Sequence, residues 1–314
     1  MKVVALGSQS RVAGDNKSHW TDSAATTAAV WPKAFVEFLD LLGEPLQQQN
    51  LRVAEDQSLV SVTHGQCGAE VIWTLETHLP GSWRVSAFHS NHVAPMKSFN
   101  TEHLERADGI AVSKDNFIAP LAIQTADCLA VAMSTESSTE IFSACCFHAG
   151  WRGFVGGIQH NAMSLIQSLA KAVTTKDSRP SKLYVTIGPA IAGSQYPCGE
   201  DVLIALREHH EHALKSLSGW TTDHESAFWN IVGLGQFAAS EKIFPDLQAL
   251  MCLEMHALGV PLESITVFRD DTFGSWHWPS HRRAMAQGLP RAGRLVTHLC
   301  PPTCPQVTNH ASNS

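Results

Sequence analysis

Short apolar runs alternate with helix-like patterns along the chain from about residue 83 onward. Apolar runs of strand length predict strands at residues 83–88, 121–124, 129–133, 141–147, 183–187, 265–268 and 295–298. Apolar side chains spaced at i, i+3 and i+4 predict helices at residues 162–173 and 202–214, and helices are also expected within 35–42 and 229–259. Strands and helices mixed in this order predict an α/β fold of mixed sheets flanked by helices.

The domain organisation follows from length and composition. The chain has 314 residues, of which 44% are hydrophobic, enough for the core of one large domain. We therefore expect a single α/β domain over residues 1–299, in which residues 1–75 are the least patterned part. Residues 300–314 are rich in Pro, Thr, Asn and Ser and are expected to form a disordered tail.

Charge and cysteine usage exclude several classes of partner. Lys and Arg total 22 against 29 Asp and Glu, and they form no basic stripe, so nucleic-acid binding is not expected. No apolar run approaches the roughly 20 residues of a membrane helix, and no signal-peptide core precedes the first strands. The eight cysteines follow no disulfide framework, which indicates the reducing cytoplasm. No patterned interface is present, so a monomer is expected.

Three side chains able to bind a metal stand at or next to predicted strand ends: His89, Cys128 and His148. One thiolate and two neutral imidazoles suit a borderline-soft ion such as zinc. Three protein ligands would leave a fourth position for water or substrate, as in catalytic zinc sites. Such a metal makes water acidic enough to act as a nucleophile near neutral pH.

From spacing alone, other interpretations of these residues stay open. Cys128 could be an inert buried thiol and His148 a core histidine. The pair could also be the nucleophile and base of a metal-free hydrolase. Elsewhere, His209, His210 and His212 fall in one polar helical stretch, where surface histidines are the simpler expectation.

The order of short motifs resembles the YfiH-type family, which has long been labelled multicopper polyphenol oxidoreductase or laccase. The motifs are TADC at 125–128, HAGWRG at 148–153 and IGPAI at 187–191. Further agreement comes from Ala107-Asp108-Gly109, from GEDV at 199–202, and from Ser280, Arg282 and Arg283 followed by Gly293-Arg294. The resemblance runs from about residue 89 to residue 294, and HAGWRG in this context is its most specific part.

The resemblance implies an α/β fold distantly similar to Cys–His deamidase toxins. It also implies that His89, Cys128 and His148 are the metal ligands, with zinc or copper as the ion. The implied activities are phosphorolysis of adenosine, inosine, guanosine and methylthioadenosine, and deamination of adenosine. The chain differs from the family pattern at Ala87, Ser90, Ala130 and Asn230, and its N-terminal part lacks the family's arginine- and glycine-rich pocket segment.

Other residues receive roles under this resemblance. Arg152 is the first candidate to hold phosphate and Arg282 or Arg283 the second, because guanidinium binds phosphate through two hydrogen bonds. Ser280 belongs to the same substrate-binding set. Asp127 is expected either to orient a ligand or relay a proton, or to organise the backbone. Competing functions are a copper-dependent polyphenol oxidase, a Cys128–His148 hydrolase, and a metal-binding protein without catalysis.

Overall fold

The computed structural model describes fifteen segments of the chain: residues 6–9, 29–43, 46–49, 59–64, 70–74, 83–89, 92–93, 97–99, 108–113, 121–136, 141–173, 182–233, 242–276, 278–289 and 294–299. For the strands that precede residue 100, the description covers the backbone alone. The tail expected at 300–314 lies outside these segments, and the assignment of residues 1–299 to one domain stays a prediction.

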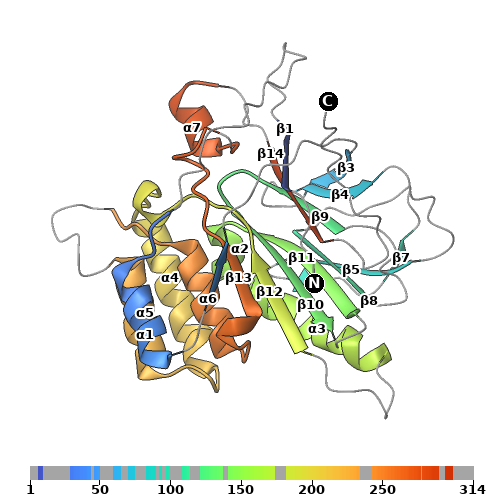
Figure 1. Ribbon diagram of the computed structural model, residues 1–314, viewed down its shortest axis with the longest axis horizontal. Helices are drawn as coiled ribbons and strands as arrows, with labels where there is room; N and C mark the ends of the chain where they lie inside the picture. The colour runs from blue at the N-terminus through green and yellow to red at the C-terminus, as the bar shows by residue number, and fades with distance from the viewer. Residues whose placement is uncertain are drawn as a thin grey trace, which may run out of the picture.

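A mixed sheet of nine strands forms the centre of the molecule (Figure 1). Its order is β2 (Gln47–Gln49), β13 (Ile265–Phe268), β12 (Lys182–Ile187), β10 (Leu129–Glu136), β11 (Ile141–Ala149), β8 (Gly109–Ser113), β5 (Trp83–His89) and β6 (His92–Val93), with β7 (Lys97–Phe99) also paired to β5. The β2–β13 and β13–β12 pairs are parallel, and the other pairs are antiparallel. The expected mixed sheet is confirmed.

A second sheet has five antiparallel strands. Its order is β1 (Leu6–Gln9), β14 (Arg294–Leu299), β9 (Leu121–Thr125), β4 (Glu70–Thr74) and β3 (Leu59–His64). The chain passes from β9 of this sheet into β10 of the larger one through residues 126–128. Cys128, a predicted metal ligand, therefore lies where the two sheets meet.

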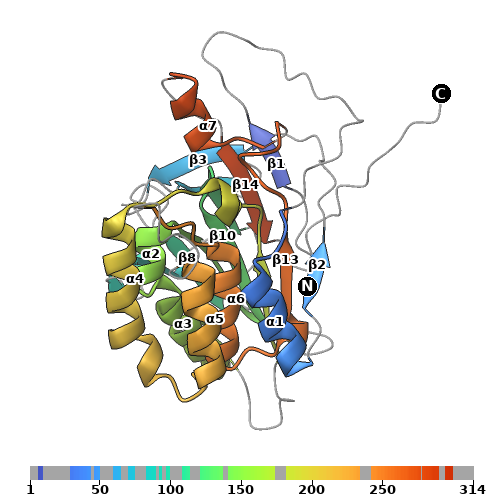
Figure 2. The same ribbon diagram turned by 90° about the vertical axis from the view of Figure 1, so that its left-hand side faces the viewer.

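Helices cover one face of the larger sheet, and the smaller sheet lies on its other side (Figures 1 and 2). The covering helices are α1 (Lys33–Leu42), α2 (Trp151–Val155), α3 (Ile158–Val173), α4 (Glu200–His212), α5 (Thr222–Val232) and α6 (Leu247–Ala257). Helix α7 (His281–Ala286) lies apart from them, on the side of the smaller sheet. Short 3-10 turns occupy Gly193–Gln195, Leu214–Ser216 and Leu262–Ser264.

The central strands β10 and β11 are buried on both faces. In β10, Leu129, Val131 and Met133 pack toward the helices, whereas Ala130 and Ala132 pack toward the smaller sheet. Both faces are therefore apolar, which explains why these strands form continuous hydrophobic runs in the sequence. Among the described helices, none combines the length and apolar character needed to cross a bilayer.

The helices expected within 229–259 are α5 and α6: Gly233 ends α5 in the left-handed conformation at φ 87°, and Asp246 caps the start of α6. One expectation about the helices is corrected. His209 and His210 of α4 are buried rather than on the surface, although His212 is exposed. Their rings face neighbouring helices: His209 bonds to Glu254 of α6, and His210 stacks on Phe228 of α5.

Candidate active site

Cys128 and His148 converge on one point above Gly150. Cys128 directly precedes β10, and His148 lies in β11, where it is paired with Ala130 of β10. A Cβ atom on residue 150 would lie 3.0 Å from the Cys128 Sγ and 3.6 Å from the His148 Nε2. Gly150 has an ordinary φ of −72°, so the glycine is required here for space rather than for conformation.

Asp108, one residue before β8, holds His148 in place. The main-chain N–H of His148 donates a 2.8 Å hydrogen bond to the main-chain carbonyl of Asp108. Nδ1 of the His148 ring lies 3.7 Å from Oδ1 of the Asp108 carboxylate. Burial lowers the pKa of His148, but interactions with Cys128 and Asp108 outweigh it and raise the pKa to about 9. The Asp108 carboxylate lies on the Nδ1 side of the ring, whereas Nε2 lies near the same point as the Cys128 Sγ. A carboxylate behind the ring is usual for metal-binding histidines.

The strand register brings His89 to the same end of the larger sheet. Phe88 of β5 and Phe147 of β11 are both paired with Gly109 of the strand between them. Because β5 and β11 both run antiparallel to β8, the next residues, His89 and His148, follow in the same direction. The side chain of His89 lies outside the described residues, so its role as a third ligand remains a prediction.

Asp127 organises the backbone around Cys128. Its φ is 78°, a left-handed value that is uncommon for residues other than glycine. Its carboxylate accepts hydrogen bonds from the Thr272 hydroxyl (2.8 Å), the Ser280 hydroxyl (3.0 Å) and the Arg282 N–H (2.7 Å). Its carbonyl accepts from the Ile191 N–H at 3.0 Å. Of the two roles expected for Asp127, these contacts support the backbone-organising one.

The serine–arginine segment that begins α7 sits beside this network. Ser280 caps α7 and is buried, so its hydroxyl serves structure. Arg283 donates to four main-chain carbonyls, those of Thr272, Phe273, Ser275 and Trp278, and is likewise structural. Arg282 donates to the Pro197 carbonyl at 2.8 Å, and its guanidinium lies 4.8 Å from the centre of the Tyr196 ring.

Tyr196 is the aromatic neighbour of Arg282. Burial, then the neighbouring Cys198 and Cys128, raise the pKa of Tyr196, while Arg282 lowers it. Arg152, by contrast, is exposed in the first turn of α2, with its guanidinium 4.2 Å from the centre of the Trp151 ring.

The site residues fit a metal ion of the zinc type. A thiolate sulfur and an imidazole nitrogen are ordinary zinc ligands, and both face a space that Gly150 leaves open. Of the five described cysteines, Cys128 is the half-buried one, and the other four are fully buried. The sequence interpretation missed the contact of Asp108 with His148, although the Ala-Asp-Gly segment was among the family motifs.

Fold and site together define an α/β protein with a cysteine–histidine centre at the junction of two sheets. The family model described as multi-copper polyphenol oxidoreductase laccase matches residues 49–300, and the chain belongs to that family. The family's description indicates metal-dependent proteins.

Curated relatives are named for an activity other than that of a laccase. A purine nucleoside phosphorylase of Deinococcus radiodurans is 36% identical over 87 residues, which are 28% of this chain and 30% of that protein. The purine nucleoside phosphorylase YlmD of Geobacillus stearothermophilus is 32% identical over 148 residues, or 47% of this chain and 44% of the relative. The matched part thus spans less than half the length of either relative.

Solved structures are similar as well. The Bacillus licheniformis protein YfiH is 22% identical with a TM-score of 0.45, covering 64% of each chain. YlmD from Geobacillus stearothermophilus is 25% identical with a TM-score of 0.44, covering 62% of this chain and 60% of that one.

Proposed function

We propose that this protein is a zinc-dependent purine nucleoside phosphorylase that also deaminates adenosine. Its substrates would be adenosine, inosine, guanosine and methylthioadenosine, together with phosphate. The observation that carries the proposal is the convergence of the Cys128 Sγ and the His148 Nε2 on the space above Gly150. The names of the relatives support the phosphorylase part, and the deaminase part rests on the resemblance to the YfiH-type family.

Each residue of the site has a distinct task in this proposal. Cys128 and His148, with His89, would hold the metal, which would supply a Lewis acid beside the substrate. Asp108 would hold the His148 backbone through its carbonyl and, with its carboxylate 3.7 Å from Nδ1, would support the ring of a metal-binding histidine. Asp127 fixes the backbone that presents Cys128, acting as a positioning residue.

Phosphate binding is assigned to Arg152 and Arg282. Arg152 is exposed immediately after Gly150, where its guanidinium is accessible to an anion. Arg282 lies at the start of α7, with its guanidinium over the ring of Tyr196. Arg283 is left out, because its guanidinium already donates to main-chain carbonyls.

A metal-free hydrolase is the second candidate, and one observation favours it. The Cys128 Sγ and the His148 Nε2 lie near the same point beside Gly150, as the nucleophile and base of a hydrolase would. A copper-dependent polyphenol oxidase is the third, because the family description names multicopper oxidoreductases. We also propose that the protein is cytoplasmic, since free thiols at the described cysteines are consistent with a reducing compartment. The expected monomeric state remains part of the proposal.

The deciding experiment is chromatographic product analysis with metal-quantified protein. Adenosine, inosine and methylthioadenosine are each incubated with and without phosphate, beside His148→Ala and the matched control His212→Ala, which removes an exposed histidine. We expect free purine that requires phosphate, and inosine from adenosine, both lost with His148→Ala and both kept with His212→Ala.

Other outcomes would assign the site differently. Absence of product from zinc-loaded, folded protein would refute the nucleoside function for these substrates. Hydrolysis that survives a chelator but not alkylation of Cys128 would favour the metal-free hydrolase. Stoichiometric copper with oxidation of phenols would favour the oxidase.

A further inference from the structure

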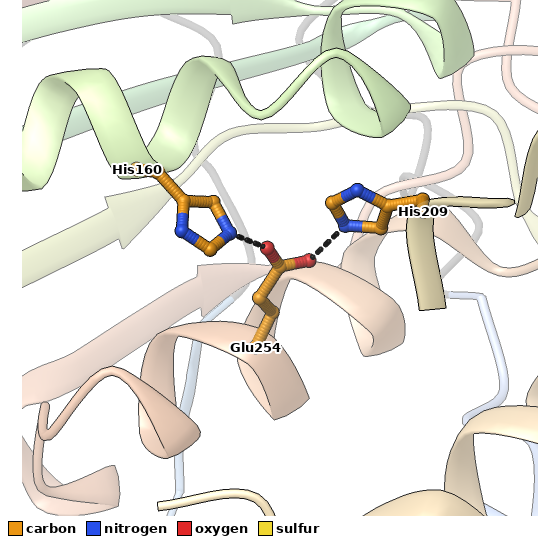
Figure 3. A group of neighbouring side chains, drawn as sticks. All are labelled: His160, His209 and Glu254. Carbon is orange, nitrogen blue, oxygen red and sulfur yellow. Dashed lines mark hydrogen bonds and ion pairs between the residues drawn. The ribbon is translucent and has the colours of Figure 1, made fainter. Parts of the chain in front are cut away.

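A second group of metal-binding side chains lies in the helical layer, away from Cys128. His160 in the first turn of α3, His209 in the last turn of α4 and Glu254 of α6 point toward one another (Figure 3). One potential ligand atom from each residue lies within 4.8 Å of the other two. The His160 Nε2 is 2.5 Å from one Glu254 oxygen, and the His209 Nε2 is 3.0 Å from the other.

Burial makes this carboxylate unusual. The side chains of Glu254 and His209 are each 1% exposed, and that of His160 is 27% exposed. An ionised carboxylate is strongly disfavoured at such depth unless it is paired or coordinates a metal. The ion pairs that the structure shows for Glu254 involve these two histidines, which are charged only when protonated. A divalent cation would neutralise the carboxylate while both rings stay neutral.

The geometry also suits a metal. In a tetrahedral zinc site with ligands at about 2.0–2.1 Å, neighbouring ligand atoms lie about 3.3 Å apart. Both nitrogen–oxygen distances, 2.5 and 3.0 Å, are shorter than that spacing, so the groups would move slightly apart around an ion, and the rings of His160 and His209 are nearly perpendicular, at 86°. Both rings already direct Nε2 to the carboxylate, so small side-chain rotations would aim all three groups at one ion. The partly exposed His160 gives that ion a path from solvent.

Neighbouring groups hold the carboxylate in place. The buried Gln159 amide donates to a Glu254 oxygen at 2.8 Å and to the Phe154 carbonyl of α2 at 3.0 Å. The Phe154 ring lies 5.3 Å from that of His209. A hydrogen bond from a neighbouring side chain to a ligating carboxylate is the usual support of a metal site. It also links this cluster to α2, the helix that begins directly after Gly150.

We propose that His160, His209 and Glu254 form a second divalent-cation site, of the zinc class, that joins α3, α4 and α6. The site is separate from the Cys128 centre and does not depend on the proposed function. Its ion fixes three helices to one another and, through Gln159 and Phe154, supports α2.

The test measures metal binding after the first centre has been removed. Full-length protein without an affinity tag is prepared as Cys128→Ser/His148→Ala, stripped with a chelator and titrated with Zn²⁺ or Co²⁺. We expect about one ion per chain, an increase in melting temperature, and Co²⁺ d–d absorption without the thiolate charge-transfer band that Cys128 would produce. Adding His160→Ala should weaken binding at least tenfold, and adding Glu254→Gln should do the same.

His212→Ala is the matched control, because it removes an exposed histidine from α4 and should leave the binding unchanged. His160→Ala also protects the test against misfolding, since His160 is the least buried of the three ligands. Folding of each variant is checked by circular dichroism. No Zn²⁺ or Co²⁺ binding by folded Cys128→Ser/His148→Ala protein would overturn the proposal. Binding that persists in both His160→Ala and Glu254→Gln would overturn it as well.

Discussion

The Ser280 hydroxyl donates a 3.0 Å hydrogen bond to Oδ2 of Asp127, 153 positions earlier in the chain. The Arg282 N–H donates to the same oxygen, and the Thr272 hydroxyl donates to the other one. Asp127, the residue beside Cys128, therefore binds both the start of α7 and the segment after β13. These bonds also hold Asp127 at its left-handed φ of 78°, a conformation that a non-glycine residue keeps only when its surroundings enforce it.

Replacing this carboxylate should destabilise the fold and impair the site together. Asp127→Ala removes the acceptor of three hydrogen bonds and leaves an alanine at positive φ. We expect a loss of about 3 kcal/mol in the free energy of unfolding, since a hydrogen bond to a charged group contributes about 1.5–3 kcal/mol and such effects are not additive. Asp127→Asn tolerates this φ and retains an acceptor, so its loss should be smaller, about 1–2 kcal/mol.

Urea unfolding provides the measurement for Asp127. Asp223→Ala is the control, because Asp223 is an exposed carboxylate in α5. Equal stability of Asp127→Ala and Asp223→Ala would show that the network around Asp127 contributes nothing.

Gly150→Ala should remove metal binding while leaving the protein folded. The new methyl group would lie 3.0 Å from the Cys128 Sγ, closer than nearly all real contacts of this kind, in the space where a metal would sit. Because the φ of residue 150 is −72°, the backbone accepts alanine without strain. We expect zinc affinity and nucleoside turnover to fall at least tenfold, as measured by zinc titration and product analysis.

Gly153→Ala, three residues later, is the matched control. Its Cβ would meet only ordinary contacts, the nearest being the His148 carbonyl at 3.6 Å. Retention of normal zinc affinity by Gly150→Ala would contradict the placement of the metal at this point.

Arg269→Ala should be strongly destabilising. The guanidinium of Arg269 is fully buried, pairs with the Asp246 carboxylate, donates to the Gln248 side chain at 2.6 Å, and lies 4.0 Å from the centre of the Trp31 ring. Truncation would leave the Asp246 charge buried without its partner, which costs about 3–5 kcal/mol. Denaturant unfolding tests this, with the exposed Arg207→Ala expected to change stability by no more than about 0.5 kcal/mol. Comparable stability of the two variants would refute the argument.

Stability should fall as the pH falls from about 6.5 to about 4, and His224 is one cause. Burial, followed by the charge of His256, lowers the pKa of His224 from 6.5 to about 4, against a smaller opposing effect of Asp223. The unfolded chain therefore takes up a proton in this interval before the folded protein does, so acid favours unfolding. The stabilisation by neutral His224 is complete above pH 6.5 and decreases below it.

Urea midpoints measured between pH 7 and pH 4 test the role of His224. His224→Gln should reduce the dependence on pH, whereas His212→Gln, which changes an exposed histidine, should not. An unchanged pH dependence in His224→Gln would rule out this residue as a cause.

Local patterns were sufficient for most of the secondary structure. The strand expected at residues 265–268 is β13, and those expected at 129–133 and 141–147 lie within β10 and β11. These predictions succeeded because strands buried on both faces are recognisable as uninterrupted apolar runs. The helices expected within 229–259 are α5, which ends where Gly233 takes the left-handed conformation, and α6, which begins after the Asp246 cap.

Predictions about individual polar side chains were less reliable. His209 and His210 were expected on the surface because their segment is polar, but their environment is set by α5 and α6. Nothing in the local sequence marks a histidine as the partner of a glutamate 45 positions away.

The sequence by itself determined the mixed α/β class and the positions of the main strands, and it singled out Cys128 and His148, whose side chains the structure brings together beside Gly150. These features depend on hydrophobic periodicity and on short motifs, which are local properties of the chain. Only the tertiary structure decided that Asp108 supports His148, that Asp127 holds α7, and that His160 meets Glu254 across 94 positions. Contacts between distant residues depend on how the sheets and helices pack, and packing is a property of the whole chain.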